Sequence, residues 1–324
     1  NENLLPTLEV VFIDEAQDLT PMQWAMVEHF ASTSERLYLA GDDDQAIYRW
    51  LGADVERFID YPAEEIVLPK SYRVKKEVQA FAQQIIGVTK NRIEKKWEPQ
   101  EEEGKVKYHQ TIESVDLSKG NWLLLGRDKF ILNKLEEECR NQGLWYEKQE
   151  HKNIVKPIAQ RMFEAVIGWN ELVNGQMIDK KTIKKVFFYK KVSDKYEEEL
   201  EKMNDAHLYD LDTLKILFGP FSVGEWQYAL EKINIQDRAY LLRLGLGEED
   251  IMKPPRIKIS TIHAAKGGEC DNVLLTTDMN IKTYTSYQKD SDDEQRVFYV
   301  GATRAKEELH VLLPQTTMHF RLAL

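Results

Sequence analysis

Two adjacent carboxylates, Asp14 and Glu15, follow a short apolar run at residues 10–13. A β-branched run of this kind indicates a buried parallel strand, and open α/β sheets carry their reactive groups where such strands end. There an aspartate can bind Mg²⁺ through its water shell, and the next glutamate can orient a water that attacks a phosphoryl group. An isolated Asp-Glu pair is more often a solvated turn, so the assignment depends on the rest of the chain.

A second polar turn follows the apolar residues 37–40. Gly41 permits a tight turn, and Gln45 offers a donor and an acceptor that could contact a terminal phosphate or its water. Between the two turns we expect a helix that begins with Thr20 as its cap. Strand, helix and strand, with acids after both strands, predict a βαβ unit.

Two aromatic residues, Tyr48 and Trp50, flank Arg49. Single-stranded bases stack on aromatic rings, and a neighbouring cation helps, at about 1–3 kcal/mol per base. The alternative is that both rings lie in the hydrophobic core, and for Trp50 the sequence favours neither interpretation.

Two arginines follow predicted elements in positions suited to a phosphate group. Arg73 comes after the predicted strand 65–68, and Arg304 comes after a helix predicted from residue 292. A guanidinium group can bind phosphate through two donors at once. One such arginine is usually a surface ion pair, whereas two could bind the same phosphate group.

Thr261 and His263 lie at the end of the predicted strand 257–262, followed by the small residues 264–265 and 267–268. The Thr and His side chains can hydrogen-bond a phosphodiester, and small residues let the backbone approach a ligand. A lone histidine is usually structural.

Composition narrows the class of protein. The 324 residues are 42% hydrophobic, enough for two or three domains with real cores. No run approaches the roughly 18 apolar residues of a membrane span, so we expect a cytoplasmic protein without membrane contact. Cys139 and Cys270 are too few for a disulfide framework or a zinc cluster. The net charge of −11 argues against global attraction to nucleic acid but leaves room for a local groove.

Strand and helix patterns alternate along the chain except at residues 152–253, where helical patterns predominate. We therefore predict that residues 152–253 form a mostly helical inserted domain. Outside this insertion we predict strands at residues 105–112, 121–127, 144–146, 257–262, 272–275 and 308–313. We predict helices at residues 75–86 and 131–140 and a loop at residues 89–105. The insertion carries a basic cluster, Lys180, Lys181, Lys184, Lys185, Lys190 and Lys191. A solvated helix face explains such a cluster better than a nucleic-acid contact does.

Five motifs in this order resemble the UvrD/Rep/PcrA group of superfamily 1 DNA helicases. They are Val11-Phe12-Ile13-Asp14-Glu15-Ala16-Gln17-Asp18, Gly41-Asp42-Asp43-Asp44-Gln45-Ala46-Ile47-Tyr48-Arg49-Trp50, Ser71-Tyr72-Arg73, Thr261-Ile262-His263-Ala264-Ala265-Lys266-Gly267 and Tyr299-Val300-Gly301-Ala302-Thr303-Arg304-Ala305. One motif could be accidental, but the ordered set is specific.

The resemblance implies RecA-like P-loop NTPase motor domains, with ATP bound between two of them and single-stranded DNA across their tops. Residues 1–62 would be part of the first motor domain, residues 63–151 and 254–324 the complete second one, and residues 152–253 the insertion.

The resemblance also implies roles for individual residues. Asp14 would bind Mg²⁺, Glu15 would activate the hydrolytic water and Gln45 would sense the terminal phosphate. Tyr72 would stack near adenine and Glu269 would lie near the nucleotide, while Arg73 and Arg304 would act as arginine fingers. The DNA contacts would come from Tyr48, Trp50, Thr261 and His263.

The sequence departs from the family pattern in several places. Gly268 and Cys270 flank Glu269 where a bulky residue and an aromatic are usual, and Arg49 replaces a small residue. The insertion is also shorter than in the best-known members. The sequence has no Gly-x-x-x-x-Gly-Lys-Ser/Thr loop, whose backbone, lysine and hydroxyl hold a triphosphate and its magnesium.

We therefore expect this chain to be the carboxyl-terminal part of an ATP-dependent 3′–5′ DNA helicase. The helicase would act on single-stranded DNA or on single-strand/duplex junctions. Its partner would be the missing N-terminal motor region of the same parent protein, and the fragment alone would be inactive. The alternative is a UvrD-like module that binds DNA or protein without ATPase activity. A helicase-nuclease fusion is disfavoured, because no nuclease-like carboxylate cluster follows residue 313.

Overall fold

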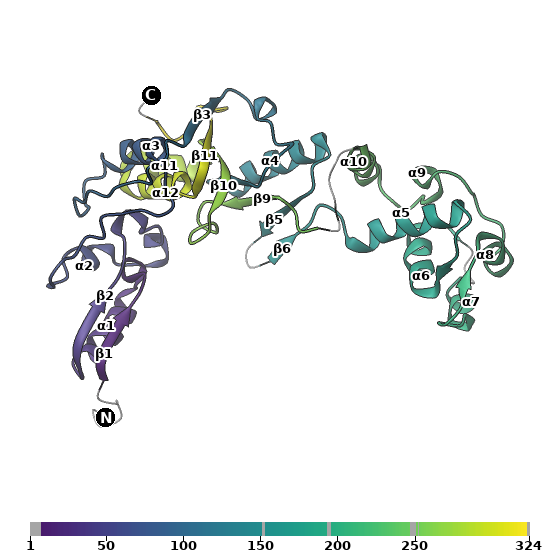
Figure 1. The fold of residues 1–324 in the computed structure, drawn as a ribbon, viewed down its shortest axis with the longest axis horizontal. Helices are drawn as coiled ribbons and strands as arrows, with labels where there is room; N and C mark the ends of the chain where they lie inside the picture. Colours follow the sequence, from purple (N-terminus) through teal and green to yellow (C-terminus); the bar gives the residue numbers. More distant parts are fainter. Residues whose placement is uncertain (1–7, 151–152, 193–195, 247–250, 252, 323–324) are drawn as a thin grey trace. The chain divides into compact units, whose positions relative to one another are not determined.

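The computed structural model describes residues 8–150, 153–192, 196–246, 251 and 253–322. The chain divides into two compact units, described separately here: residues 1–138, 148–154 and 255–324 form the first, and residues 139–147 and 155–254 the second. The first unit is a mixed α/β structure whose sheets are mostly parallel (Figure 1).

The amino-terminal elements form the predicted βαβ unit. Strands β1 (Leu8–Ile13) and β2 (Ser34–Leu39) pair in parallel, with helix α1 (Pro21–Ala31) between them in sequence. Thr20 begins α1 with a capping box, because its hydroxyl accepts from the Gln23 N–H while the Gln23 side chain accepts from the Thr20 N–H. This prediction is confirmed.

The larger sheet has seven strands in the order β3-β11-β10-β4-β9-β5-β6. Their bounds are Lys105–His109 (β3), Trp122–Gly126 (β4), Tyr146–Glu150 (β5), Asn153–Val155 (β6), Ile257–Thr261 (β9), Cys270–Thr276 (β10) and Ala305–Leu312 (β11). The pairs β3/β11, β11/β10, β10/β4 and β4/β9 are parallel. The carboxyl ends of these strands therefore lie at one edge, where Thr261 and His263 come at the end of β9. Glu269 and Arg304 instead come immediately before β10 and β11.

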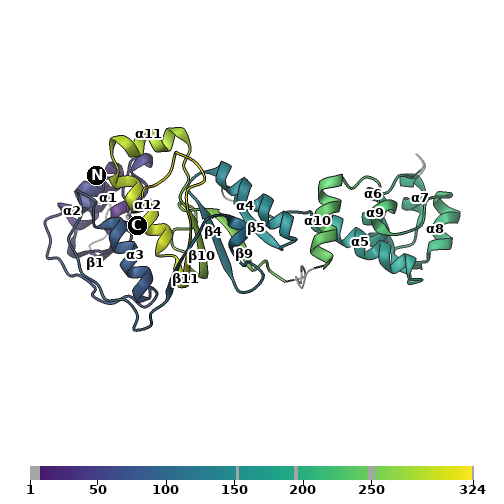
Figure 2. The same ribbon diagram turned by 90° about the horizontal axis from the view of Figure 1, so that it is seen from above.

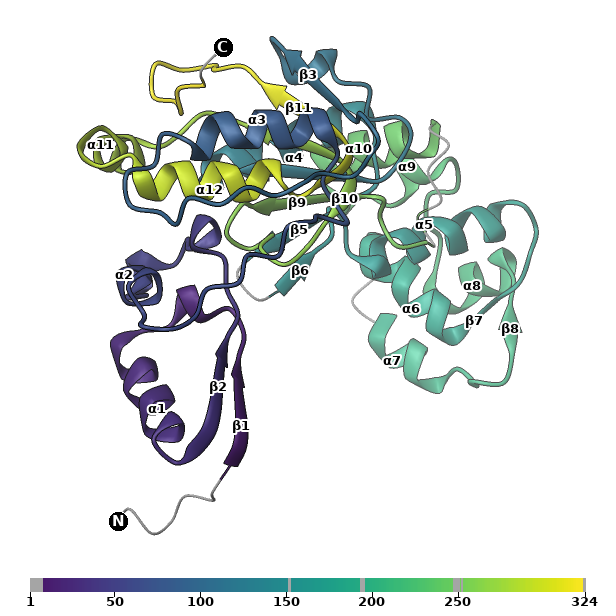
Figure 3. The ribbon, with the colours of Figure 1, turned by 60° about the vertical axis from the view of Figure 1, so that its left-hand side comes forward.

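Helices cover both faces of this sheet. Helices α3 (Lys76–Ile86) and α12 (Asp292–Ala302) lie side by side, in one core cluster with Leu123 and Leu125 of β4 (Figure 3). Alternate residues of a strand face opposite sides, so Gly126 lies on the other face, where an added Cβ would meet α4 (Lys129–Gln142). Figure 2 shows the sheet between α12 and α4.

Shorter elements complete the first unit. They are helices α2 (Val55–Ile59) and α11 (Ile281–Lys289) and the 3-10 turns η2 (Ala16–Asp18), η3 (Asp43–Gln45), η4 (Arg49–Leu51) and η5 (Ile112–Ser114). The first three turns lie in or beside the motifs after β1 and β2.

The second unit is mostly helical. It contains α5 (Gln160–Val173), α6 (Lys180–Tyr189), α7 (Tyr196–Lys202), α8 (Leu211–Phe218), α9 (Trp226–Ala229) and α10 (Ile235–Leu246), with the small antiparallel pair β7 (Ile178–Asp179) and β8 (Leu208–Tyr209). Helices α5 and α6 approach closely at Gly168, where an added Cβ would lie 2.4 Å from the Thr182 methyl group. Residues 151–152, at the predicted domain boundary, lie outside the described residues.

One predicted strand is wrong. Residues 65–68 have no regular structure, with Ile66 76% and Leu68 83% exposed. The apolar run resembles a strand, but a strand requires a hydrogen-bonded neighbour, and the described part of the chain supplies none at this position.

Candidate functional site

The turn after β1 has an unusual backbone at Glu15. Its φ of 52° and ψ of 39° lie in the left-handed region, which costs a non-glycine residue about 1–3 kcal/mol. The Asp14 carboxylate helps to hold this turn, since its Oδ1 accepts from the Glu15 N–H at 2.9 Å. The strained position is therefore the predicted catalytic glutamate.

A continuous series of hydrogen bonds connects Glu15 to Arg304. Gln17 Nε2 donates to Glu15 Oε2 at 2.6 Å, and Gln17 Oε1 accepts from the Asp42 N–H at 3.0 Å. The Asp42 carboxylate accepts from Gln45 Nε2 at 2.7 Å, and Gln45 Oε1 accepts from Arg304 Nη2 at 3.2 Å. A carboxylate only accepts and a guanidinium group only donates, so both neighbours require the same orientation of the Gln45 amide.

Arg304 is held rigidly at one end of this series. It is 1% exposed, and it donates to the Val300 carbonyl at 2.9 Å and the Gly268 carbonyl at 3.2 Å. Burial, with the nearby charge of Arg73 as the second cause, lowers the pKa of Arg304 to about 10. The side chain therefore stays protonated at neutral pH.

Arg73 has a donor to spare. Its Nε is buried and has no partner among the described residues. The guanidinium groups of Arg73 and Arg304 repel one another, and Arg73 has an unpaired buried donor. The two groups are therefore suited to bind an anion such as a phosphate group. These two residues therefore fit the phosphate part of a nucleotide.

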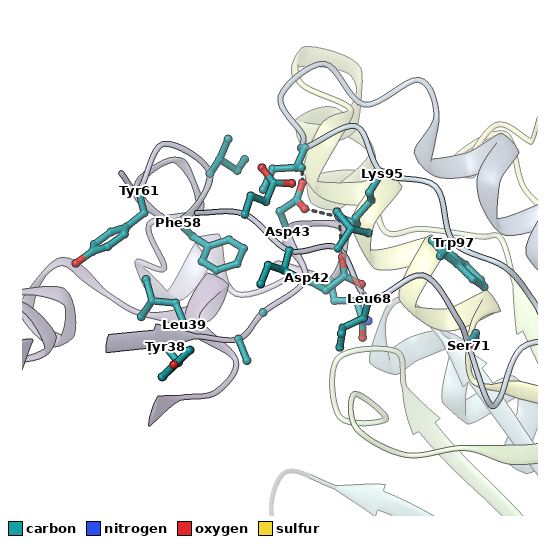
Figure 4. A pocket seen from close by; sticks show the side chains of 18 of the residues that line it. Tyr38, Leu39, Asp42, Asp43, Phe58, Tyr61, Leu68, Ser71, Lys95 and Trp97 are labelled. Atoms are coloured by element: carbon teal, nitrogen blue, oxygen red, sulfur yellow. Dashed lines mark hydrogen bonds and ion pairs between the residues drawn. The ribbon is translucent and has the colours of Figure 1, made fainter. Parts of the chain in front are cut away.

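A pocket of about 680 Å³ opens beside these groups (Figure 4). Gln45, Arg73 and Thr303 contribute to its wall, and Figure 4 shows the Asp42, Asp43 and Lys95 side chains gathered on one side. Phe58 and Tyr61 line another part. The pocket thus combines a charged wall with an apolar one.

The acids of the second turn form a buried ionic cluster that the sequence did not predict. Asp43 and Asp44 are 1% and 0% exposed; Asp44 accepts two hydrogen bonds from Arg92, at 2.8 and 2.6 Å. The Lys95 Nζ forms ion pairs with all three consecutive aspartates. It lies 2.9 Å from Asp42 Oδ1 and 3.1 Å from Asp44 Oδ2, and it also contacts Asp43. Arg92 and Lys95 belong to the segment 89–105, correctly predicted to be a loop.

The predicted DNA-contacting residues form a second group. The Tyr48 hydroxyl donates to the His263 carbonyl at 3.1 Å, and the Trp50 ring meets the His263 ring edge-on at 6.0 Å. Trp50 is 68% exposed, so it does not lie in the core, whereas Tyr48 is partly buried and packs against the core. Of the two interpretations left open for Trp50, the core one is therefore wrong.

His263 is a neutral side chain at pH 7. Burial, and then the positive charge of Arg127, lowers the pKa of His263 to about 4. Its Nε2 is buried without a partner in the described part of the chain. It can therefore offer a hydrogen bond, but it adds no charge attraction to a phosphodiester.

Lys266, which the sequence did not single out, lies between the two groups. Its Nζ is 3.3 Å from Glu15 Oε2, pairs with Asp18 and lies 5.2 Å from the centre of the Tyr48 ring. Burial raises the pKa of Asp18 despite this lysine. Its place in a matching motif was the only available signal, because no spacing rule identifies a contact between residues 15 and 266.

Three predicted residues lie apart from the series that connects Glu15 to Arg304. Tyr72 is 82% exposed and lies under the Lys70 ammonium group, whose Nζ is 5.8 Å from the ring centre. Glu269 is exposed and 3.7 Å from Lys306, and Thr261 accepts from the Ala264 N–H. The structure does not bring these side chains into the series that ends at Arg304.

Three of the six lysines in the basic cluster of the second unit have partners within that unit. Lys180 pairs with Asp205 at 3.2 Å and Lys185 with Glu164 at 2.7 Å. Lys190 is fully buried and donates to the carbonyls of Ser222 and Ala229. These contacts favour the structural interpretation over a DNA-binding surface.

The mixed α/β architecture with its mostly parallel sheets is consistent with the motor domains of helicases. Comparison with known families agrees: residues 2–64 match the UvrD/REP helicase N-terminal domain, and residues 127–316, more than half of the chain, match the UvrD-like helicase C-terminal domain. The chain belongs to the UvrD-like helicase family.

Several bacterial relatives are similar over part of their length. The ATP-dependent DNA helicase PcrA of Bacillus subtilis is 25% identical over 194 residues, which is 56% of this chain and 24% of the relative. PcrA of Staphylococcus aureus strain Mu50 is 27% identical over 265 residues, 75% of this chain and 32% of the relative. The chain thus spans less than a third of the length of these curated relatives. Within the described residues, no helix has the length and apolar character needed to cross a membrane.

Proposed function

We propose that this chain contributes part of the ATPase site and part of the DNA-binding surface of an ATP-dependent 3′–5′ DNA helicase. The observation that carries the proposal is the hydrogen-bonded series from Glu15 through Gln45 to Arg304, with Arg73 beside it. It links a carboxylate suited to orient water with cations suited to stabilise a phosphoryl-transfer transition state.

The residues of this site would divide the work of ATP hydrolysis. Glu15 orients the attacking water, and Gln45, held by Asp42, contacts the terminal phosphate or that water. Arg304 and Arg73 neutralise charge that develops on the phosphoryl oxygens. Asp14 would hold Mg²⁺, which supplies charge neutralisation on the phosphates when bound.

The remaining assignments rest on the family resemblance. Tyr72, 82% exposed, would stack near adenine, and Glu269 would lie near the nucleotide. Trp50, with Tyr48, would stack DNA bases, while Thr261 and His263 would hydrogen-bond the strand. The substrates would be single-stranded DNA or junctions with duplex DNA.

We infer that the N-terminal motor region of the same parent protein completes the site. The 324 residues contain no phosphate-binding Gly-Lys-Ser/Thr loop. A parallel sheet is normally covered on both faces, yet Phe12 of β1 is 75% exposed and Tyr38 of β2 47%, with their rings stacked 4.9 Å apart. This uncovered face supports a docking surface for that region, and without it the chain hydrolyses ATP poorly or not at all.

The domain boundaries predicted at 62/63, 151/152 and 253/254 and the cytoplasmic location belong to the same proposal.

DNA-stimulated ATP hydrolysis by the parent protein, with its N-terminal region present, tests the proposal. Glu15→Gln and Arg304→Ala should each lower the rate about 10³-fold or more, since each removes transition-state stabilisation. Glu137→Gln and Arg321→Ala, both at exposed positions, are the matched controls and should leave the rate unchanged. Full activity in the first two variants would contradict the assigned roles.

The second candidate function is a DNA- or protein-binding module without ATPase activity, favoured by the missing phosphate loop. A parent protein that binds single-stranded DNA but hydrolyses no ATP would establish this function instead.

A further inference from the structure

Lys95 makes a contact pattern that the ATPase chemistry described above leaves unexplained. Its ammonium group touches the carboxylates of Asp42, Asp43 and Asp44, and the lysine side chain is only 14% exposed. A lysine that serves only as a solvated charge would not be buried against three acids, because burial costs desolvation that the contacts must offset.

The three acids are not equivalent in their other partners. Arg92 binds Asp44 with two hydrogen bonds, so this carboxylate has its own counter-ion. Asp43 accepts from the Ile93 N–H at 2.9 Å. Asp42 has no cation other than Lys95 among its described partners, and its second oxygen holds Gln45.

The geometry points to a path from Lys95 to the nucleotide site. Lys95 lies 2.9 Å from Asp42 Oδ1, and Gln45 Nε2 donates to Asp42 Oδ2 at 2.7 Å. If the lysine charge is removed, Asp42 and Asp43 lose the cation they share while Asp44 keeps Arg92, and like charges this close repel. A displaced Asp42 no longer fixes the Gln45 amide toward Arg304.

We propose that Lys95 is a positioning residue for ATP hydrolysis, which acts through Asp42 to hold the Gln45 amide in its orientation toward Arg304. The inference rests on the proposed function and deepens it, because it assigns a role to a loop residue outside the five motifs. Lys95 acts on the hydrolytic step rather than on nucleotide binding, so kcat and KM should respond differently.

The test uses the parent protein with its N-terminal region, and measures kcat and KM for ATP in the presence of single-stranded DNA. Lys95→Met should lower kcat about tenfold or more and change KM by less than about threefold. Lys75→Met is the matched control: Lys75 is equally buried, with its side chain 11% exposed, and pairs with Glu102 and Glu307. The control should leave kcat unchanged.

A double-mutant cycle separates positioning from general destabilisation. If Lys95 acts through Gln45, Lys95→Met combined with Gln45→Ala should be no slower than Gln45→Ala alone. Multiplying effects, or equal losses in Lys95→Met and Lys75→Met, would overturn the inference.

Two further comparisons keep the result decisive. If Lys95→Met melts well below the wild type, Asp42→Ala replaces it, because this variant removes the carboxylate that links Lys95 to the Gln45 amide. A normal kcat in Asp42→Ala would overturn the inference. An inactive wild-type parent overturns the proposed function, and this role with it. An active wild type with normal Lys95→Met kinetics overturns the role of Lys95 alone.

Discussion

Gly41, in the turn after β2, lies close to the Gln17 side chain in the turn after β1. An added Cβ would lie 2.5 Å from Gln17 Oε1 and 2.8 Å from the Phe58 ring. Gln17 is fully buried and links Glu15 to the Asp42 backbone, so it has little room to move. The sequence assigned Gly41 to a tight turn, whereas the structure shows that its missing side chain makes space for the Gln17 side chain.

We therefore expect Gly41→Ala to lower the free energy of unfolding by about 1–3 kcal/mol, the usual cost of overpacking a close-packed site. Urea unfolding monitored by tryptophan fluorescence measures this change. Gly224→Ala is the control, since a Cβ there meets nothing within 4 Å and should cost little. Equal unfolding midpoints for the two variants would contradict this prediction, because they would show that the site can accommodate the added methyl group.

The sequence could identify some site residues and not others for a physical reason. Asp14, Glu15, Gln45 and Arg304 lie in motifs whose residue types suggest their chemistry. Lys266 and Glu15 are separated by 251 positions in the sequence, and their contact depends on the tertiary fold. A local sequence pattern does not show which distant residues come into contact. The same holds for Lys95, which looked like one charge among many in a charged loop.

At the scale of elements, local signals predicted helices well and isolated strands less well. Helix α1 has its own start signal in Thr20 and Gln23, and its stability depends little on distant residues. A strand depends on its neighbour, so the apolar residues 65–68 could not reveal that they pair with nothing. Strands β4 and β10 were predicted because burial on both faces leaves a continuous apolar run.

Strands β3 and β11 carry a pair of histidines that makes this part of the sheet sensitive to pH. His109 Nε2 and His310 Nδ1 are 2.9 Å apart, and His310 Nε2 is 3.1 Å from Glu308. Burial lowers the pKa of both histidines below 6.5. The unfolded chain therefore binds more protons than the folded chain near pH 6.5, and stability falls as the pH drops through that value.

We expect the melting temperature to decrease between pH 7.5 and pH 5.5, and His310→Gln to make this decrease smaller. Glu308, whose pKa is lowered to about 2 mainly by Lys107, stays ionised over this range and contributes no slope there. His29→Gln, at an exposed position of α1, is the control and should retain the wild-type slope. A steeper decrease in His310→Gln would reverse the assigned sign.

At the scale of the whole molecule, the sequence predicted the mixed α/β class and the family, because five motifs in order leave few alternatives. The mostly helical second unit was expected from the break in alternation after β5. Its basic cluster shows the limit of that approach: composition gave the number of lysines, but only the fold shows that Lys190 is buried against backbone carbonyls.

The uncovered sheet of β1 and β2 also affects how the chain behaves in the test tube. Its two strands have unpaired outer edges in the described part of the chain, and free edges beside apolar side chains favour pairing between molecules. Sedimentation velocity should show self-association of the chain at about 100 μM, reduced by Phe12→Lys. Tyr228→Lys, at a position 74% exposed in the second unit, should not reduce it. A surface of this kind makes solubility during purification a simple assay for whether the proposed N-terminal motor region is bound.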